Sequence, residues 1–342
     1  MTDWKAGLNG DPLPWLLESD TTQPSVRYFT LRDILDIDEN SVELKEAQRA
    51  IMSTGPVPVI LDAQEKEGYW MKPGAGYSPK YRSTVWQIIF LAQLGADTTD
   101  RRVQAAGDYI LSHAIAKHGG FTYNGTSSAF IHCLAGNLGA ALIDLGFAND
   151  PRLMTALEWQ ARMITGAGIA DSEDKDILDR YYAYTPGPLF ACGPNMGLPC
   201  GWGAVKAMLA LGKVPPSSRT GNISTAIEQG TEFLLSRDPA IADYPFGRGD
   251  KPSSSWFKLG YPIGYVADML QNLEVLTLLG RINDPRLAHS LEFLQSKQDS
   301  LGRWKMEYSL NGKMWADIEK KGLPSKWITL RALRVLKAAY PQ

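Results

Sequence analysis

The sequence has 342 residues, of which 44 % are hydrophobic and 21 % are charged, and its formal net charge is −2. This composition is ordinary for a globular protein, and the nearly neutral charge excludes the strongly basic field that recruits nucleic acid or anionic lipid. No uninterrupted apolar run reaches the ~18 residues that a membrane-spanning helix requires. Three cysteines in a chain of this size argue against a disulfide framework, and the first residues do not have the pattern of an export signal, so we expect a cytoplasmic protein.

The first predicted element covers residues 25–35, where apolar and charged side chains recur with helical spacing. We expect this segment to be an outer helix that carries no functional site.

Helical patterns then recur along the chain, and four of them end in a Leu-Gly pair. The four glycines are Gly95, Gly146, Gly212 and Gly280. They stand 51, 66 and 68 residues apart, and each suits the left-handed residue that ends a helix. Asp100, Asp150 and Asp284 follow where the cap of the next helix is expected. The repeating unit is therefore helix, tight turn, helix, and the chain holds about eleven or twelve helices.

Two segments share the spacing Gln-x-x-x-Gly-x-Trp, at Gln64–Trp70 and Gln298–Trp304, and a degenerate copy lies at His118–Phe121. This spacing resembles the QW motif of squalene and oxidosqualene cyclases, and the resemblance extends to the β-subunits of prenyltransferases. It covers the chain from about residue 50 to its end. The resemblance implies an all-α fold, an (α/α)6 toroid of about six helical hairpins, whereas the repeat alone also allows an open solenoid.

We predict a single domain that spans residues 1–342. Its helical repeat is interrupted by two coil-rich insertions, near residues 165–197 and 238–260. Long loops that retain many aromatic side chains are typical of lids, so we expect both insertions to cover one mouth of the ring.

Residues twelve or thirteen positions before each turn glycine are expected to form one layer near the N-termini of the inner helices. The layer consists of Ser83, Cys133, Cys200 and Asp268. His132 precedes Cys133, and Cys192 lies eight residues before Cys200, so all three cysteines fall in one zone.

Thiolate, imidazole and carboxylate groups together suit Zn²⁺, so one hypothesis is a zinc site formed by Cys133, Cys200, Asp268 and His132. Prenyltransferases hold zinc with Asp, Cys and His, but their Asp-x-Cys pair is missing here, and the resemblance implies only the type of site. A second hypothesis is catalysis by Cys133, Cys200 and Asp268 without a metal. A third is that the cysteines pack as small hydrophobic side chains.

Other candidate residues lie around this layer. Tyr182 and Tyr184, in the first insertion, are candidates for proton transfer. The aromatic side chains expected to line the substrate cavity are Trp86, Trp202, Tyr265 and Trp327. Their faces would stabilise positive charge that develops on a substrate.

The acidic motifs of terpene cyclases, Asp-x-Asp-Asp and Asp-Asp-x-x-Asp, are absent, so the resemblance concerns the fold. We expect an enzyme, of the isoprenoid transferase, lyase or isomerase type, acting on a small apolar substrate such as an isoprenoid or its diphosphate. One alternative is a metal-free alkenol dehydratase or isomerase that uses cysteines, which resembles linalool dehydratase-isomerase. Another is a non-catalytic toroid that binds lipids or peptides. The clustered cysteines favour an enzyme, and we expect no nucleic-acid partner.

Overall fold

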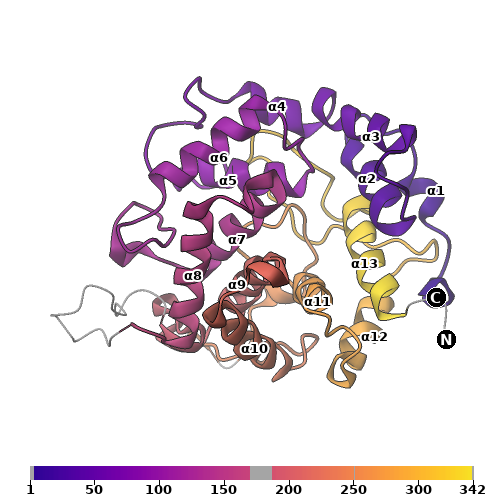
Figure 1. The fold of residues 1–342 in the computed structure, drawn as a ribbon. Helices are drawn as coiled ribbons and strands as arrows, with labels where there is room; N and C mark the ends of the chain where they lie inside the picture. Colours follow the sequence, from indigo (N-terminus) through magenta and orange to yellow (C-terminus); the bar gives the residue numbers. More distant parts are fainter. Residues whose placement is uncertain (1–3, 170–186, 250, 341–342) are drawn as a thin grey trace.

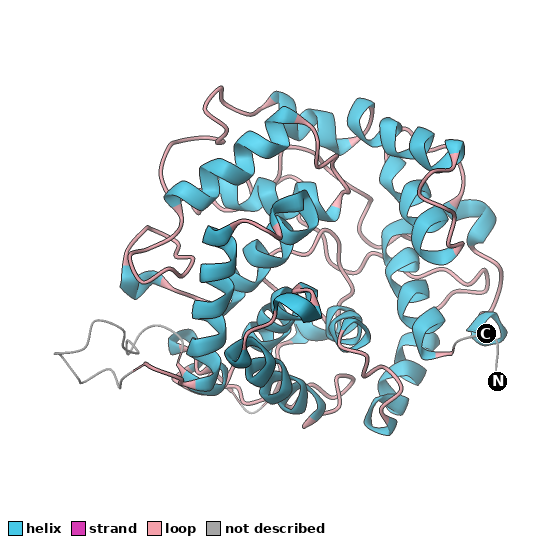
Figure 2. Cartoon of the chain, in the orientation of Figure 1, coloured by secondary structure: helices cyan, strands magenta, loops and turns pink. Residues whose placement is uncertain are grey.

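The computed structural model describes residues 4–169, 187–249 and 251–340, and this part of the chain contains thirteen α-helices and no strand. The only extended pairings there are isolated bridges between loop residues. The fold is therefore all-α, as the sequence predicts (Figure 2).

Six helices form an inner ring, and seven shorter or more exposed helices surround it (Figure 1). The inner helices are α2 (Pro24–Phe29), α5 (Thr84–Gln93), α7 (His132–Leu142), α9 (Gly201–Lys213), α11 (Met269–Leu278) and α13 (Lys326–Ala339). The outer helices are α1 (Leu13–Leu16), α3 (Val42–Ser53), α4 (Pro56–Asp62), α6 (Arg101–His113), α8 (Pro151–Thr165), α10 (Gly221–Leu235) and α12 (Ala288–Ser296). This arrangement is an α/α toroid.

Short helical segments extend or connect these helices. Two of them are π-helical, η2 (Thr30–Ile34) and η4 (Ile143–Phe147). The others are the 3₁₀ segments η1 (Trp4–Gly7), η3 (Ser127–Ala129), η5 (Pro188–Phe190), η6 (Gly193–Asn195), η7 (Pro216–Ser218), η8 (Ser254–Phe257) and η9 (Pro285–Leu287).

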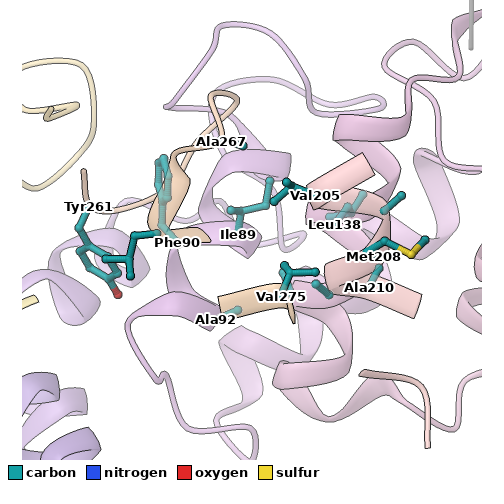
Figure 3. Close-up of a cluster of buried hydrophobic side chains, with 14 of the residues drawn as sticks. Ile89, Phe90, Ala92, Leu138, Val205, Met208, Ala210, Tyr261, Ala267 and Val275 are labelled. Carbon is teal, nitrogen blue, oxygen red and sulfur yellow. The ribbon is translucent and has the colours of Figure 1, made fainter. Parts of the chain in front are cut away.

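Burial separates the two layers. All eleven residues of α7 are buried, and α5 is buried from Thr84 to Ala92, because these helices are apolar on every side. In the outer helix α6, by contrast, the buried apolar residues Val103, Ala106 and Ile110 recur with helical spacing on one face. Side chains from α5, α7, α9 and α11 meet between the inner helices and pack into one core (Figure 3).

Each inner helix contacts the next along the series α5, α7, α9, α11, α13 and α2. The series closes where Ser25 Oγ, on α2, donates a 2.6 Å hydrogen bond to the carbonyl oxygen of Leu94 after α5. Trp327 Nε1 of α13 donates to Gln23 Oε1 in front of α2 at 2.7 Å. The segment 25–35 therefore forms an inner helix, and the expectation of an outer helix is wrong. It packs inside because Val26, Phe29 and Ile34 are buried in the main core of the ring.

The predicted turns and caps are confirmed at most positions. Asp100, Asp150 and Asp284 each accept a hydrogen bond from the backbone two residues later at the start of an outer helix. Three turn glycines, Gly95, Gly146 and Gly280, have φ values of 74°, 91° and 69°. The prediction for the fourth, Gly212, is wrong, because α9 continues through it to Lys213.

The two Gln-x-x-x-Gly-x-Trp segments have the same geometry. Gln64 Nε2 donates to the carbonyl oxygen of Arg102 on the next outer helix at 2.9 Å, and Trp70 Nε1 donates back to Ile60 at 2.7 Å. Gln298 Nε2 likewise reaches Gly7 at 3.1 Å. Trp304 Nε1 donates to Leu294 at 2.8 Å. In each case the glutamine side chain joins two hairpins, while the tryptophan side chain bonds to the helix just before it.

A further segment, residues 261–265, crosses the interior between inner helices. Gln93 exchanges two 2.8 Å hydrogen bonds with the backbone of Ile263, and Asn137 Nδ2 donates to the carbonyl oxygen of Gly264 at 3.0 Å. Tyr265 lines one cavity, while Tyr261 and Ile263 line a second, larger cavity of about 550 Å³. The segment therefore lies between two separate cavities.

The first Gln-x-x-x-Gly-x-Trp segment allows a direct test at its glycine, Gly68. A Cβ added at Gly68, where φ is 93°, would stand 2.6 Å from the carbonyl oxygen of Ala105. We expect Gly68→Ala to lower the free energy of unfolding by about 2–4 kcal/mol. The added Cβ would overlap the carbonyl oxygen of Ala105, and an alanine is also strained at this left-handed φ. Gly74→Ala is the matched control, since Gly74 has φ of 113° and open space around it.

The control should lose only about 1–2 kcal/mol in the same denaturant titration. Equal losses of unfolding free energy in the two variants would contradict the close approach of Gly68 to α6.

Candidate active site

Three thiols meet at the N-terminus of α9. Cys200 is the N-cap of this helix, and its sulfur accepts a hydrogen bond from the backbone N–H of Gly203 at 3.5 Å. The thiols of Cys133, in the first turn of α7, and Cys192, in the loop before α9, lie close enough to this sulfur to act on its pKa as hydrogen-bond partners. All three cysteines are free, so the cluster contains three reduced thiols.

The three thiols differ in pKa. The hydrogen bonds from Cys133 and Cys192, supported by the backbone N–H groups of Gly203 and Trp202, hold the pKa of Cys200 well below its ordinary value. The hydrogen bond to Cys200 and burial raise the pKa values of both Cys133 and Cys192. These shifts make Cys200 the first of the three thiols to ionise, at the positive end of a helix dipole, with Cys133 and Cys192 as its thiol neighbours.

The thiols face a cavity of about 280 Å³. Its walls are largely apolar and carry several aromatic rings. The lining residues are Ile131, Cys133, Cys192, Pro194, Asn195, Cys200, Gly201, Trp202, Ala242, Tyr244, Pro245, Phe246, Arg248, Pro252, Ser253, Trp256 and Tyr265. Of the four aromatic residues predicted for the substrate wall, Trp202 and Tyr265 line this cavity.

The other two predicted aromatic residues are buried in the ring beside it. Trp86 Nε1 donates to the carbonyl oxygen of Tyr77, and its ring centroid lies 6.2 Å from that of Tyr265. Trp327 stacks on Tyr261 with centroids 4.0 Å apart. Trp86 thus lies behind Tyr265 of the thiol cavity, whereas Trp327 lies behind Tyr261 of the second cavity, and neither is among the residues that line the thiol cavity.

Residues of both insertions form one side of the cavity. Asn195 Nδ2 donates to the carbonyl oxygen of Pro245 at 3.0 Å, and Asn195 Oδ1 accepts from Gly247 N at 2.9 Å. Arg248 Nε donates to Pro194 at 2.8 Å. These bonds tie the described part of the first insertion to the second. Tyr182 and Tyr184 lie outside the described residues.

Asp268 is at the predicted level but serves another network. It caps α11 by accepting from Gln271 N at 2.7 Å, and it also accepts from Gly260 N at 3.0 Å. Arg331 of α13 forms an ion pair with it at 3.2 Å. All of these partners hold the carboxylate in the wall between α11 and α13, away from the residues that line the thiol cavity.

His132 lies beside Cys133 but points elsewhere. Its Nε2 is 3.5 Å from the carbonyl oxygen of Gly187, and its ring packs edge-on against Phe130 and Phe190. Burial lowers the pKa of His132 to about 4, so the ring is neutral.

These positions bear on the predicted zinc site. Asp268 is bound to Arg331, and His132 is turned toward Gly187. Within residues 4–169, 187–249 and 251–340, no three His, Cys, Asp or Glu side chains are arranged to hold a metal ion. The four predicted ligands do not converge on one point, so we derive no chemistry through zinc.

A buried lysine lies further along the helix that Cys200 caps. Lys206 is completely buried, and its Nζ donates to Gln271 Oε1 on α11 at 2.6 Å. Burial lowers the pKa of Lys206 to about 7, against opposing contributions from Cys133 and Asp268. The sequence does carry a signal for this residue, because a lysine stands within an otherwise apolar helix, but that signal alone predicts no role for it.

Comparisons with known proteins find only a distant structural likeness. Neither the comparison with protein families nor that with curated proteins finds a match. Among solved structures, the chain is similar to a variant of the type II terpene cyclase MstE from Scytonema with its substrate, geranylgeranyl dihydroxybenzoate. The identity is 15 %, the TM-score is 0.45, and the match covers 94 % of this chain and 88 % of that one.

A second variant of the same cyclase, with the product merosterolic acid A, matches at 14 % identity and a TM-score of 0.34, covering 87 % of this chain and 97 % of the other. These values describe a distant likeness of helical arrangement. In the described part of the chain, no helix has the length and apolar character needed to cross a bilayer.

Alkylation would test the charge state of Cys200. We expect the rate of its reaction with iodoacetamide to level off at a lower pH than that of an ordinary thiol, because the pKa of Cys200 is lowered. An ordinary thiol becomes about tenfold faster per pH unit below its pKa of about 8.5. Mass spectrometry of the Cys200 peptide measures the rate, and Cys133→Ala with Cys192→Ala should restore the ordinary pH dependence. A tenfold rise of the alkylation rate per pH unit up to about pH 8.5 in the unaltered protein would contradict the lowered pKa of Cys200.

The lowered pKa of Lys206 predicts that its contribution to stability depends on pH. Its pKa is about 7 in the folded protein and 10.5 when exposed, so between these values the unfolded chain binds more protons. The contribution of Lys206 to the free energy of unfolding therefore rises with pH, by at most about 1.4 kcal/mol per pH unit. We expect the difference between the unaltered protein and Lys206→Met, measured by denaturant titration, to change with this sign from pH 7 to pH 10. A constant difference would show that Lys206 is charged in the fold.

Proposed function

We propose that this protein is an enzyme that removes water from, or isomerises, a small apolar alkenol by thiol acid–base catalysis. The observation that carries the proposal is the convergence of three cysteines on the wall of an apolar, aromatic cavity, where the neighbouring thiols and the start of α9 lower the pKa of Cys200. Isoprenoid alcohols are the substrate class that this cavity suits best, because they combine an apolar chain with a single hydroxyl group.

The size of the cavity limits the substrate. Ligand pockets typically measure about 300–1,000 Å³, so a cavity of about 280 Å³ suits a small molecule. It leaves little room for a polypeptide, which distinguishes it from a site for transfer to proteins. Trp202, Tyr244 and Trp256 present ring surfaces that exclude water and stabilise positive charge developing on an alkenyl carbon.

The thiol cluster supplies a base and an acid at the same time. Dehydration requires a proton for the departing hydroxyl group and a base for a proton on the adjacent carbon. Cys192 or Cys133 donates the first proton, and Cys200 accepts the second, so an alkene and water form without net change in the charge of the cluster. Proton transfer along the hydrogen bonds between the thiols restores the starting state.

The same groups catalyse isomerisation when the water returns to a different carbon. Neither reaction needs an oxidant, a reductant or a metal ion. Asp268 and His132 have no step in this mechanism, since their hydrogen bonds lead to Arg331 and Gly187.

The test is turnover of allylic and tertiary isoprenoid alcohols in D₂O, followed by gas chromatography with mass spectrometry. We expect an alkene lighter by one water, or an isomeric alcohol that carries deuterium. Cys200→Ser should lower kcat by about 10²–10⁴-fold, the range typical of a general base. Added chelator should leave the rate unchanged.

Binding of the alcohol to Cys200→Ser, measured by calorimetry, is the control that shows an intact cavity. Binding without turnover by the unaltered protein would favour a non-catalytic binder and overturn the enzyme proposal. Loss of activity with chelator, restored by zinc, would assign the chemistry to a metal site.

A further inference from the structure

Cys192 and Cys200 belong to two paired segments of one loop. Cys192 N donates to the carbonyl oxygen of Leu198 at 3.1 Å, and Cys200 N donates to Phe190 at 2.9 Å. An antiparallel bridge joins Ala191 and Pro199 between them. The pairing places both side chains on the same face of the loop, where they line the cavity together.

Cys133, the third thiol, lies on a helix whose backbone has little freedom to move toward Cys200. It lies in α7, which packs directly against α9: a Cβ added at Gly136 would stand 2.2 Å from the carbonyl oxygen of Lys206. Backbones in such close contact leave no space for the two helices to approach further. Cys133 is also only 4 % exposed, whereas Cys192 is half-buried.

A disulfide requires a sulfur–sulfur distance of about 2.05 Å, well below a thiol–thiol hydrogen bond, so its formation needs a shift of one partner. A loop residue can make this shift by a local change of backbone, whereas the closely packed backbones of α7 and α9 have less freedom to move. The geometry therefore favours Cys192 over Cys133 as the partner of Cys200.

We propose that Cys200 and Cys192 form a redox pair that reduces an apolar organic hydroperoxide in the cavity and ends as a reversible Cys192–Cys200 disulfide, while Cys133 stays a thiol. The apolar aromatic walls accept the organic part of the hydroperoxide, and the accessible partner is the loop thiol.

The electrons and atoms of this reaction balance. The Cys200 thiolate attacks the terminal oxygen of ROOH; the sulfur–oxygen bond forms, the O–O bond breaks, and the alkoxide takes a proton from water to become ROH. The Cys192 sulfur then attacks the Cys200 sulfenic acid; the disulfide forms, and the hydroxide leaves as water with the Cys192 proton. A small thiol such as dithiothreitol returns both cysteines to the reduced state.

This reaction shares the cavity and Cys200 with the proposed function but uses sulfur as a nucleophile and electron donor. Its readout is a covalent bond, so it can be measured without any alkenol. Failure of the dehydratase assay leaves it standing, and the reverse also holds.

The test treats the reduced full-length protein with cumene hydroperoxide, alkylates the remaining thiols with N-ethylmaleimide and maps the peptides by mass spectrometry. We expect one Cys192–Cys200 disulfide, one alkylated Cys133 and one cumyl alcohol per disulfide. Dithiothreitol should restore three alkylatable thiols.

Three variants sharpen the result. Cys133→Ser should still form the disulfide, whereas Cys192→Ser should stop at a Cys200 sulfenic acid that dimedone traps. Cys200→Ser should form neither product, and circular dichroism shows whether each variant is folded. A Cys133–Cys200 disulfide, three unmodified thiols in the treated protein, or a disulfide between two chains would overturn the proposal.

Discussion

The inner helices of this toroid begin inside the protein, where their first backbone N–H groups need acceptors that solvent cannot supply. At three of these starts the capping side chain is both a structural cap and a chemical group placed toward the interior. Ser325 caps α13, Asp268 caps α11 and Cys200 caps α9. The character of each cap decides what its surroundings must contain. A hydroxyl needs no counter-ion, whereas a buried carboxylate does, and Asp268 has one in Arg331. Cys200 replaces the cation with two neutral thiols and the helix dipole.

Much of the fold was predictable because its signals are local. The caps Asp100, Asp150 and Asp284, together with the turn glycines, depend on conformations that one or two residues determine. The spacing Gln-x-x-x-Gly-x-Trp likewise encodes a turn and two hydrogen bonds within one joint. The placement of residues 25–35 was not predictable in this way. An amphipathic helix reports that one face is buried, but not that α13 and α5, from distant parts of the chain, lie on either side of it.

The candidate site was predictable only to the level of a layer. Counting back from the turn glycines predicts a layer near the helix N-termini, and the structure has Cys200 and Asp268 as N-caps and Cys133 in the first turn of its helix. The directions of their side chains depend on tertiary partners. No residue near Asp268 in the sequence predicts its ion pair with Arg331, which is 63 residues away. Cys192 lies outside the repeat, so its place beside Cys200 follows from the pairing of its loop.

The use of sulfur has a physical consequence for an apolar cavity. A catalytic carboxylate at the position of Cys200 would need a cation of its own, as Asp268 does, and that cation would occupy the cavity wall. A thiol is a small apolar side chain when neutral, so Cys133 and Cys192 can stand in the same wall as Trp202 and Tyr244 without unmet charge. The single thiolate is confined to the helix N-terminus, where backbone N–H groups already face it. The cluster can thus hold a base, two acids and an apolar surface within one cavity, and its loop thiol gives the same sulfur a second partner.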